Sequence, residues 1–480
     1  MHASLPKSGR PLRLWPIVVF AGLALFVYRL AILLHSTFGD IGVEQIVYHL
    51  ASPSVGVPTR LIKEALRELF VKPVTLAILL YLLLLLIRRF KSFFTTLKHI
   101  IHVGAWVILS LGSYNLYNVT GLGGYIQDRS VQFGKDFDWF ASYYSRPVVS
   151  IDDKTEKLNL VWIYVESLET RRTQLEPFKH HPIYRVNTVQ RFENLPGTGW
   201  TMGGMVASQC GLPLMPVGLL SGNGLGDADY FLPKTLCLGD ILKKQNYAIE
   251  FIGGGDTAFA GTKKFLDTHG FDAVIGRQEI HNITGQDYPA DSWGYTDERV
   301  LELALQRTSA LHQAGRPFFL SVQTLDTHGP NGYLSASCKQ QGWRDDIDGI
   351  FGCAMSQVGR FVDKLYKSGV QKNTVVVVSG DHPFMGKPTS RLFSANQKID
   401  RSVFFSVLRP DRVVLDVAVM NHFDMFPTVL SALKFKTENH SAGLGRNLYV
   451  RNSLSHDEPP GLLAKALRQP SDTYLSQWTP

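Results

Sequence analysis

Acidic residues and histidines follow three apolar runs in this 480-residue chain. They are Glu166 after the run 159–165, Asp326 and His328 after 318–323, and Asp381 and His382 after 374–380. One acid after a strand is usually a turn or cap residue, so only the joint placement indicates a site. Carboxylates and an imidazole together form an oxygen and nitrogen shell that suits Mn²⁺, Zn²⁺ or Mg²⁺.

A candidate nucleophile lies in the glycine-rich segment 197–205, where Thr201 stands at the predicted start of a helix. The free N–H groups and the dipole of a helix N-terminus favour a phosphate, and a bound metal lowers the pKa of a hydroxyl. The alternative is a helix cap with a structural role only. No G-x-x-x-x-G-K-[ST] sequence occurs, which disfavours nucleotide-driven chemistry.

The elements that must position these residues follow from the pattern of apolar residues. Runs rich in Val and Ile predict buried strands at 158–165, 248–252, 318–323 and 374–379. Helical patterns lie between them, at 236–245, 297–314 and 356–368. This alternation predicts a parallel sheet between two layers of helices, with ligands bound at the carboxyl ends of the strands.

The positive charge of the chain belongs to its N-terminal quarter. The net charge is +8, and residues 1–120 hold twelve Lys and Arg against four acids, so the remainder is balanced. A nucleic-acid partner is therefore not expected. Apolar runs at 14–34, 69–87 and 100–116 each approach the ~20 residues that cross a bilayer, and basic residues flank such spans.

The basic residues also predict the orientation in the membrane. Three precede the first span and four fill the connection between the second and third: Lys7, Arg10, Arg13, Arg88, Arg89, Lys91 and Lys98. Because basic loops stay in the cytoplasm, everything after about residue 118 is expected outside it. A helical stripe at 61–70 fits either an amphipathic helix in the headgroup layer or a helix packed on the spans.

All four cysteines lie in the exported part: Cys210, Cys237, Cys338 and Cys353. An even number in an oxidising compartment indicates two disulfides, for which three connectivities exist. We expect Cys210–Cys237 and Cys338–Cys353, because pairing sequence neighbours closes the shortest loops. No C-x-x-C spacing supports a zinc site instead.

Four ordered motifs resemble those of the alkaline phosphatase and sulfatase superfamily. They are Asn159-Leu-Val-Trp-Ile-Tyr-Val-Glu-Ser167, the turn Gly197-Thr-Gly-Trp-Thr201, Leu325-Asp-Thr-His-Gly-Pro330 and Ser379-Gly-Asp-His382. The segment 421–428 is similar to the H-x-D-x-x-P-T element of the same superfamily. Within it, the chain looks like the phosphoglycerol transferases of osmoregulated periplasmic glucans, which are relatives of lipoteichoic acid synthase.

The apolar runs predict a membrane domain with three transmembrane helices at 1–117 and a connector at 118–157, and the resemblance implies an alkaline-phosphatase-like α/β/α sandwich at 158–455, followed by a tail at 456–480. It implies one divalent metal, Mn²⁺ first and Zn²⁺ or Mg²⁺ as alternatives, bound by Glu166, Thr201, Asp381 and His382. Thr201 would be the nucleophile, and His328 would contact the phosphate or the leaving group. The Trp and Arg of the synthase-like members are replaced at 259–263, where Lys263 either binds substrate or is a solvated lysine.

The implied reaction moves phosphoglycerol from phosphatidylglycerol to a periplasmic glucan through a phospho-threonine and releases diacylglycerol. It would take place at the periplasmic face of a bacterial inner membrane. The first alternative is a phosphoethanolamine transferase acting on lipid A or another surface glycan. Others are a sulfatase-like hydrolase, for which a C/S-x-P-x-R motif is missing, and a catalytically inactive, membrane-anchored glycan-binding protein.

Overall fold

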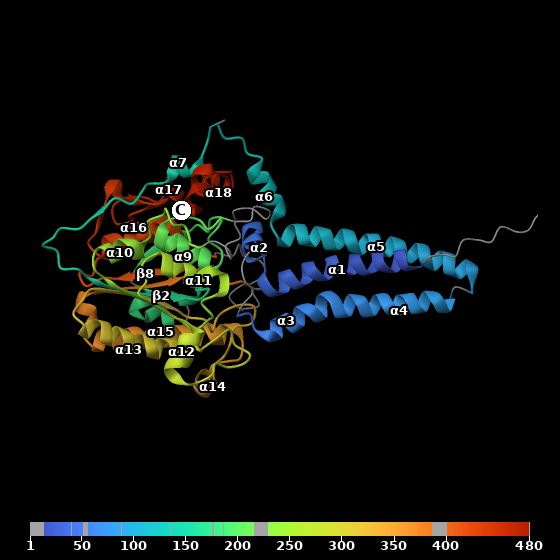
Figure 1. Cartoon of the computed structure of the whole chain (residues 1–480), viewed down its shortest axis with the longest axis horizontal. Coiled ribbons are helices and arrows are strands. Elements are labelled where there is room, and N and C mark those ends of the chain that lie inside the picture. Colours follow the sequence, from blue (N-terminus) through green and yellow to red (C-terminus); the bar gives the residue numbers. More distant parts are fainter. Residues whose placement is uncertain are drawn as a thin grey trace, which may run out of the picture.

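The computed structural model describes residues 14–39, 41–50, 56–87, 89–134, 136–174, 177–185, 187–215, 229–385 and 401–479. Within these ranges, long N-terminal helices extend together to one side of a large α/β domain (Figure 1). Four residues used to predict the orientation, Lys7, Arg10, Arg13 and Arg88, lie outside the described residues.

Three helical segments are long and apolar enough to cross a membrane: Trp15–Phe38, Thr59–Ile87 and Ser92–Val119. The first is α1, and the last belongs to α5 (Lys91–Val119). The middle segment consists of α3 (Thr59–Leu66), a π-helical turn (Arg67–Val71) and α4 (Lys72–Ile87). The amphipathic stripe expected at 61–70 is therefore not a separate helix, because it runs directly into the second span.

The three segments pack closely on one another. A Cβ on Gly112 of α5 would lie 2.7 Å from the backbone nitrogen of Tyr28 of α1, so the two backbones approach as only a small residue permits. Arg29 of α1 donates to Glu68 at 3.0 Å. The positive charge inside the first span is therefore paired, as charges in membrane segments usually are.

The α/β domain is built on a six-stranded sheet with strand order β5-β4-β6-β2-β7-β8. All neighbours are parallel except β7 and the edge strand β8 (Phe405–Leu408), which pair antiparallel. The parallel strands are β2 (Asn159–Val165), β4 (Ala248–Gly253), β5 (Ala273–Ile275), β6 (Phe318–Gln323) and β7 (Thr374–Gly380). β2, β4, β6 and β7 agree with the predicted strands, whereas the short β5 and β8 were not predicted.

Helices cover both faces of this sheet, as Figure 1 shows. Alternate side chains of β2 enter two apolar clusters, Trp162 in one and Ile163 in the other. The first face carries α9 (Thr201–Cys210), α10 (Leu238–Lys244) and α16 (His422–Ala432), and the second carries α12 (Arg277–Thr284), α13 (Asp297–Gln313) and α15 (Ile347–Lys367). The predicted α/β/α sandwich behind membrane helices is confirmed.

Helix α15 begins at Ile347, well before the predicted start at residue 356. The side chain of Asp346 accepts a hydrogen bond from the backbone N–H of Gly349 at 2.8 Å. This is an N-cap, which satisfies a backbone donor that the first turn of a helix leaves free.

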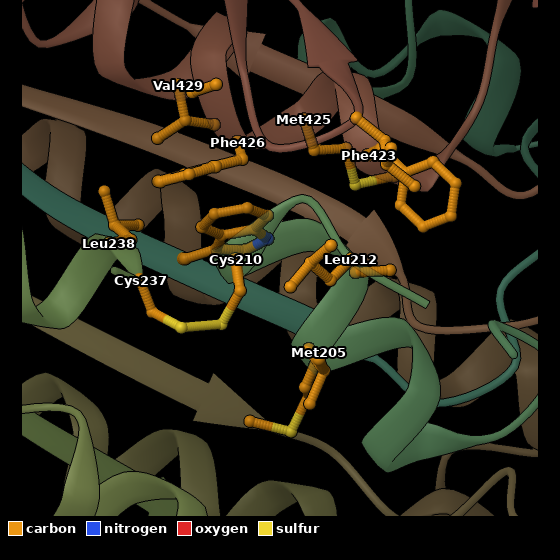
Figure 2. Close-up of a cluster of buried hydrophobic side chains, with 14 of the residues drawn as sticks. Met205, Cys210, Leu212, Cys237, Leu238, Phe423, Met425, Phe426 and Val429 are labelled. Atoms are coloured by element: carbon orange, nitrogen blue, oxygen red, sulfur yellow. A yellow bond between two sulfur atoms is a disulfide. The ribbon is translucent and has the colours of Figure 1, made fainter. Parts of the chain in front are cut away.

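Two disulfides are present, Cys210–Cys237 and Cys338–Cys353, and they are the expected pairs. The first joins the end of α9 to the start of α10 and lies beside Leu238, Phe426 and other apolar side chains (Figure 2). Because Thr201 is the first residue of α9, this disulfide anchors the far end of the helix that carries the candidate nucleophile.

The segment after the third membrane helix packs against the C-terminal residues. The ring of Tyr474, in α19 (Asp472–Leu475), lies 5.2 Å from the ring of Trp139, in α7 (Trp139–Tyr143). Arg468 forms an ion pair with Asp128 of α6 (Leu122–Arg129) and a second, at 2.7 Å, with Glu44. These contacts join the expected connector and tail to one another and to the loop between the first two membrane helices.

Candidate active site

The carboxyl ends of the central strands bring three predicted metal ligands together. Glu166 follows β2, and Asp381 and His382 follow the adjacent strand β7. All three side chains are buried, and one ligand atom from each lies within 4.8 Å of the others. The Nε2 atom of His382 is 3.3 Å from Glu166 Oε1 and 3.5 Å from Asp381 Oδ2.

This donor set fits a divalent cation. Two carboxylates and one imidazole supply oxygen and nitrogen ligands, and buried charges of this kind occur where they are paired or coordinate a metal. Burial raises the pKa of Glu166, but the charges of His328 and His382 outweigh it and lower this pKa to about 2. Burial lowers the pKa of His382, but Asp381 and Glu166 raise it to about 9.

Thr201 lies beside the three ligands. Its Oγ1 atom is 3.4 Å from Glu166 Oε2 and 3.4 Å from His382 Nε2. It is the first residue of α9, and its N-cap Trp200 makes no side-chain capping bond. The hydroxyl is therefore placed at a helix N-terminus among acidic and imidazole groups, where a phosphate and a cation can both approach it.

Several residues that sequence reasoning missed hold Asp381 in place. The backbone N–H of Ser167 donates to Asp381 Oδ1 at 2.8 Å, and the side-chain amide of Gln323 donates to Oδ2 at 3.3 Å. The Nε2 atom of His422 is 2.8 Å from the Asp381 carbonyl oxygen. Such outer contacts orient metal ligands. Ser167 ends the first of the four motifs, Gln323 ends a predicted strand and His422 lies in the segment 421–428, but no pattern in the sequence indicates their contacts with Asp381.

Ser167 is held in an unusual backbone conformation next to Glu166. Its φ is +57°, in the left-handed region that residues other than glycine seldom adopt. Its hydroxyl donates to Glu166 Oε1 at 2.7 Å, while its N–H reaches Asp381. The strained turn thus links two of the three candidate ligands, as such turns often do at functional sites.

His328 forms a separate wall of the site. Its Nδ1 atom is 2.9 Å from the carbonyl oxygen of Gly329, which can only accept, so Nδ1 carries the proton and Nε2 is free of that bond. Its ring lies 4.2 Å from that of Trp293. A pocket lined by both rings also reaches Arg60 of α3.

Two other predicted residues are placed differently. Among the described residues, no contact joins the Asp326 carboxylate to the ligand cluster. Its Oδ2 atom accepts a hydrogen bond from the backbone N–H of Asp297, at the start of α13. Lys263 is half exposed and pairs with Asp267 at 2.9 Å. No described contact joins Lys263 to Thr201 or His328.

Comparison with known proteins places the chain in a family. The sequence model of the sulfatase family matches residues 159–435, which is more than half of the chain. The chain belongs to the sulfatase family. The superfamily resemblance of the four motifs is thereby confirmed, and this sulfatase-family domain contains Glu166, Thr201, Asp381 and His382.

Curated relatives of the sulfatase-family chain include two proteins named phosphoglycerol transferase I. Those from Salmonella choleraesuis (strain SC-B67) and Escherichia coli (strain SMS-3-5 / SECEC) are 35% identical over 335 residues, which is 66% of this chain and 42% of theirs. The chain therefore spans less than half the length of these relatives.

Solved structures with a similar sulfatase-family domain include a lipoteichoic acid synthase from Listeria monocytogenes, at 16% identity and a TM-score of 0.45. It matches over 68% of this chain and 81% of that one. An alkaline phosphatase superfamily protein from Vibrio parahaemolyticus is 21% identical with a TM-score of 0.46, over 69% of this chain and 79% of that one.

Proposed function

We propose that the chain is a membrane-anchored phosphoglycerol transferase that moves phosphoglycerol from phosphatidylglycerol to a periplasmic glucan and releases diacylglycerol. The observation that carries the proposal is the Thr201 hydroxyl, which lies 3.4 Å from both Glu166 and His382 at the N-terminus of α9. The relatives named phosphoglycerol transferase I, at 35% identity, support the transferred group.

Glu166, Asp381, His382 and Thr201 would hold one divalent ion, for which Mn²⁺ is our first choice because three of the four donors are oxygen atoms. When bound, such an ion supplies positive charge that lowers the pKa of a hydroxyl and offsets the charge of a phosphate.

The chain's own residues then account for two displacements at phosphorus. In the first, Thr201 Oγ1 loses its proton and attacks the lipid phosphodiester, the bond from phosphorus to the diacylglycerol oxygen breaks, and that oxygen takes up a proton. In the second, a glucan hydroxyl loses its proton and attacks the phospho-threonine, the bond from phosphorus to Oγ1 breaks, and Thr201 regains a proton. His328 presents Nε2 to donate or accept these protons, since its Nδ1 is engaged by Gly329.

The orientation in the membrane is part of the proposal. Arg89 lies in the short connection between the second and third helical segments and Lys98 lies in the first turns of α5, and basic residues at this end of the spans favour the cytoplasm. The catalytic domain would then face the periplasm, where a phospholipid headgroup is available as donor. Alkaline phosphatase fused after residue 150 should be active, and activity of a cytoplasm-only fluorescent fusion there would contradict this orientation.

The decisive experiment is incubation of the full chain with phosphatidylglycerol labelled in its acyl chains. Wild type should release labelled diacylglycerol, and Thr201→Ala should release none while its fold and metal content stay nearly intact, because the other three ligands remain. Thr188→Ala, which alters an exposed threonine of β3 (Thr188–Phe192), is the matched control and should match wild type. Diacylglycerol at the wild-type level from Thr201→Ala would refute the nucleophile, and release only from labelled phosphatidylethanolamine would favour the phosphoethanolamine alternative.

A further inference from the structure

A short helix between the first two membrane segments, α2 (Val43–Leu50), lies on the catalytic domain rather than on the membrane helices alone. The hydroxyl of Tyr48 is buried and donates to the carbonyl oxygen of Ala260 at 2.5 Å. The side-chain amide of Gln45 contacts the sulfur of Met385 at 2.8 Å, three residues beyond His382. Helix α2 is thus fixed to two loops that border the candidate active site.

His49 is the residue that α2 brings to this border. Its ring lies 6.2 Å from that of Trp200, the neighbour of Thr201, and 6.1 Å from that of Phe259. Phe259 in turn lies 6.1 Å from Trp293, which contacts His328. His49 therefore belongs to a row of aromatic side chains that extends from Trp200, next to Thr201, to Trp293, next to His328.

The hydrogen bonding of His49 determines what its free nitrogen can do. Nδ1 is 2.8 Å from the carbonyl oxygen of Gln45, which can only accept, so Nδ1 carries the proton. In the neutral ring, Nε2 then has a lone pair and accepts hydrogen bonds. Burial, together with the charges of His328 and His382, lowers the pKa of His49 and so favours the neutral form.

We propose that His49 contacts substrate and accepts a hydrogen bond from a substrate hydroxyl through Nε2, so that the loop between the membrane helices forms one wall of the active site. A lone pair at Nε2 repels phosphate oxygens and suits an O–H donor. The hydroxyl comes either from the glycerol headgroup of the donor or from the glycan acceptor. This inference rests on the proposed function for the identity of those two substrates.

The test compares full-length variants in lipid nanodiscs. His49→Ala should lower the steady-state rate of diacylglycerol release from phosphatidylglycerol about tenfold, the effect of one lost hydrogen bond. His49→Gln should recover part of the loss, because its side-chain oxygen can also accept. His99→Ala is the matched control, because His99 makes the same Nδ1 bond to the carbonyl four residues earlier but is exposed on α5. Wild-type kinetics in His49→Ala with every substrate would overturn the proposal.

Two further arms identify the source of the hydroxyl. Phosphatidylpropanol lacks headgroup hydroxyls, so a defect of His49→Ala that disappears with this donor assigns the contact to the glycerol headgroup. A defect that persists, together with accumulation of phosphorylated Thr201 in peptide mass spectra, assigns it to the acceptor. An equal defect on both donors without that accumulation would show that His49 only supports the fold, and would also overturn the proposal.

A binding readout separates this proposal from the proposed function. Glycerol 1-phosphate should protect His49, but not His99, from modification by diethyl pyrocarbonate. If wild type turns over no phospholipid and protection is still seen, the proposed function fails and the His49 contact stands. Equal modification of His49 with and without glycerol 1-phosphate, in a protein whose two disulfides are intact, would count against a headgroup contact.

Discussion

Gly204 lies directly against the backbone of Asp381: a Cβ at Gly204 would be 1.9 Å from the Asp381 carbonyl oxygen. The same carbonyl oxygen is 2.8 Å from His422 Nε2. The loop that carries a candidate metal ligand is thus pressed between the helix that carries Thr201 and the start of α16. The two halves of the site, nucleophile and ligand, are positioned by one contact between backbones.

Gly204→Ala should therefore damage both stability and activity. The added methyl group cannot be accommodated by moving a flexible side chain, since the obstacle is backbone, and such overpacking costs about 1–3 kcal/mol. A lower Tm and a large loss of diacylglycerol release are expected. Gly199→Ala is the control for stability, because a Cβ there meets no atom within 4 Å. An unchanged Tm in Gly204→Ala would contradict the close contact.

One divalent ion per chain should be found by elemental analysis of the purified protein. Chelation should abolish turnover and lower the Tm, because removing a cation leaves Glu166, Asp381 and His382 buried without their neutralising partner. Mn²⁺ should restore activity. Glu166→Gln should lower metal content, whereas Glu302→Gln, at an exposed position of α13, should not. Full activity in the chelated protein would rule out the metal centre.

The pH dependence of stability should reveal the raised pKa of Asp297. Burial raises the pKa of Asp297 to about 6, against the lowering effect of hydrogen bonds from the backbone of Leu325 and Asp326. The folded chain then binds the proton more tightly than the unfolded chain, whose pKa is near 3.8. Stability from this group is complete below about pH 4 and is lost as the pH rises to about 6.

Asp297→Asn removes this titration and keeps an oxygen that can accept the two backbone N–H groups. Relative to wild type, its Tm should therefore improve as the pH rises from 4 to 6 and stay higher at pH 7. Asp267→Asn, at an exposed position, should show no such trend. A constant difference in Tm between Asp297→Asn and wild type across this range would refute the shift.

Removing either disulfide should lower stability, but only removal of Cys210–Cys237 should also lower activity. Replacing Cys338 and Cys353 with serine opens a loop of 15 residues and should cost about 3 kcal/mol with activity retained at low temperature. Replacing Cys210 and Cys237 frees the end of α9 as well, so it should also reduce turnover. Thermal unfolding and diacylglycerol release, measured on both double variants, test the contrast. Equal loss of activity in both would mean that the anchoring of α9 is unimportant.

Much of the architecture could be predicted because burial on both faces leaves a strong pattern. The run 374–380 is continuously apolar through Val378, and strand β7 follows it closely. The edge strands β5 and β8 were missed because three or four residues carry too little pattern. The continuity of the stripe at 61–70 with the second span was not predicted either, since an amphipathic helix and an apolar helix differ in composition whether or not they are joined.

The candidate site was predicted only in part, for a similar reason. Glu166 and Asp381 follow long strands, so their convergence could be foreseen from the parallel sheet. His49 could not, because its place depends on how a short loop helix docks on a domain that begins more than a hundred residues later. Gln323 and Gly204 each help to position Asp381, one by a hydrogen bond to its carboxylate and the other by close packing against its backbone. The spacing of residues in the sequence does not reveal either contact.

Helix α2 lies between α1 and α3 in the sequence, and it is fixed to the catalytic domain through Tyr48 and to the C-terminal tail through Glu44. The domain is therefore held at separate points and cannot swivel freely as it would on a single tether. Membrane helices adjust their tilt to the thickness of the bilayer. If His49 contacts substrate as proposed, a change in bilayer thickness that tilts these helices should shift His49 and change the rate of turnover.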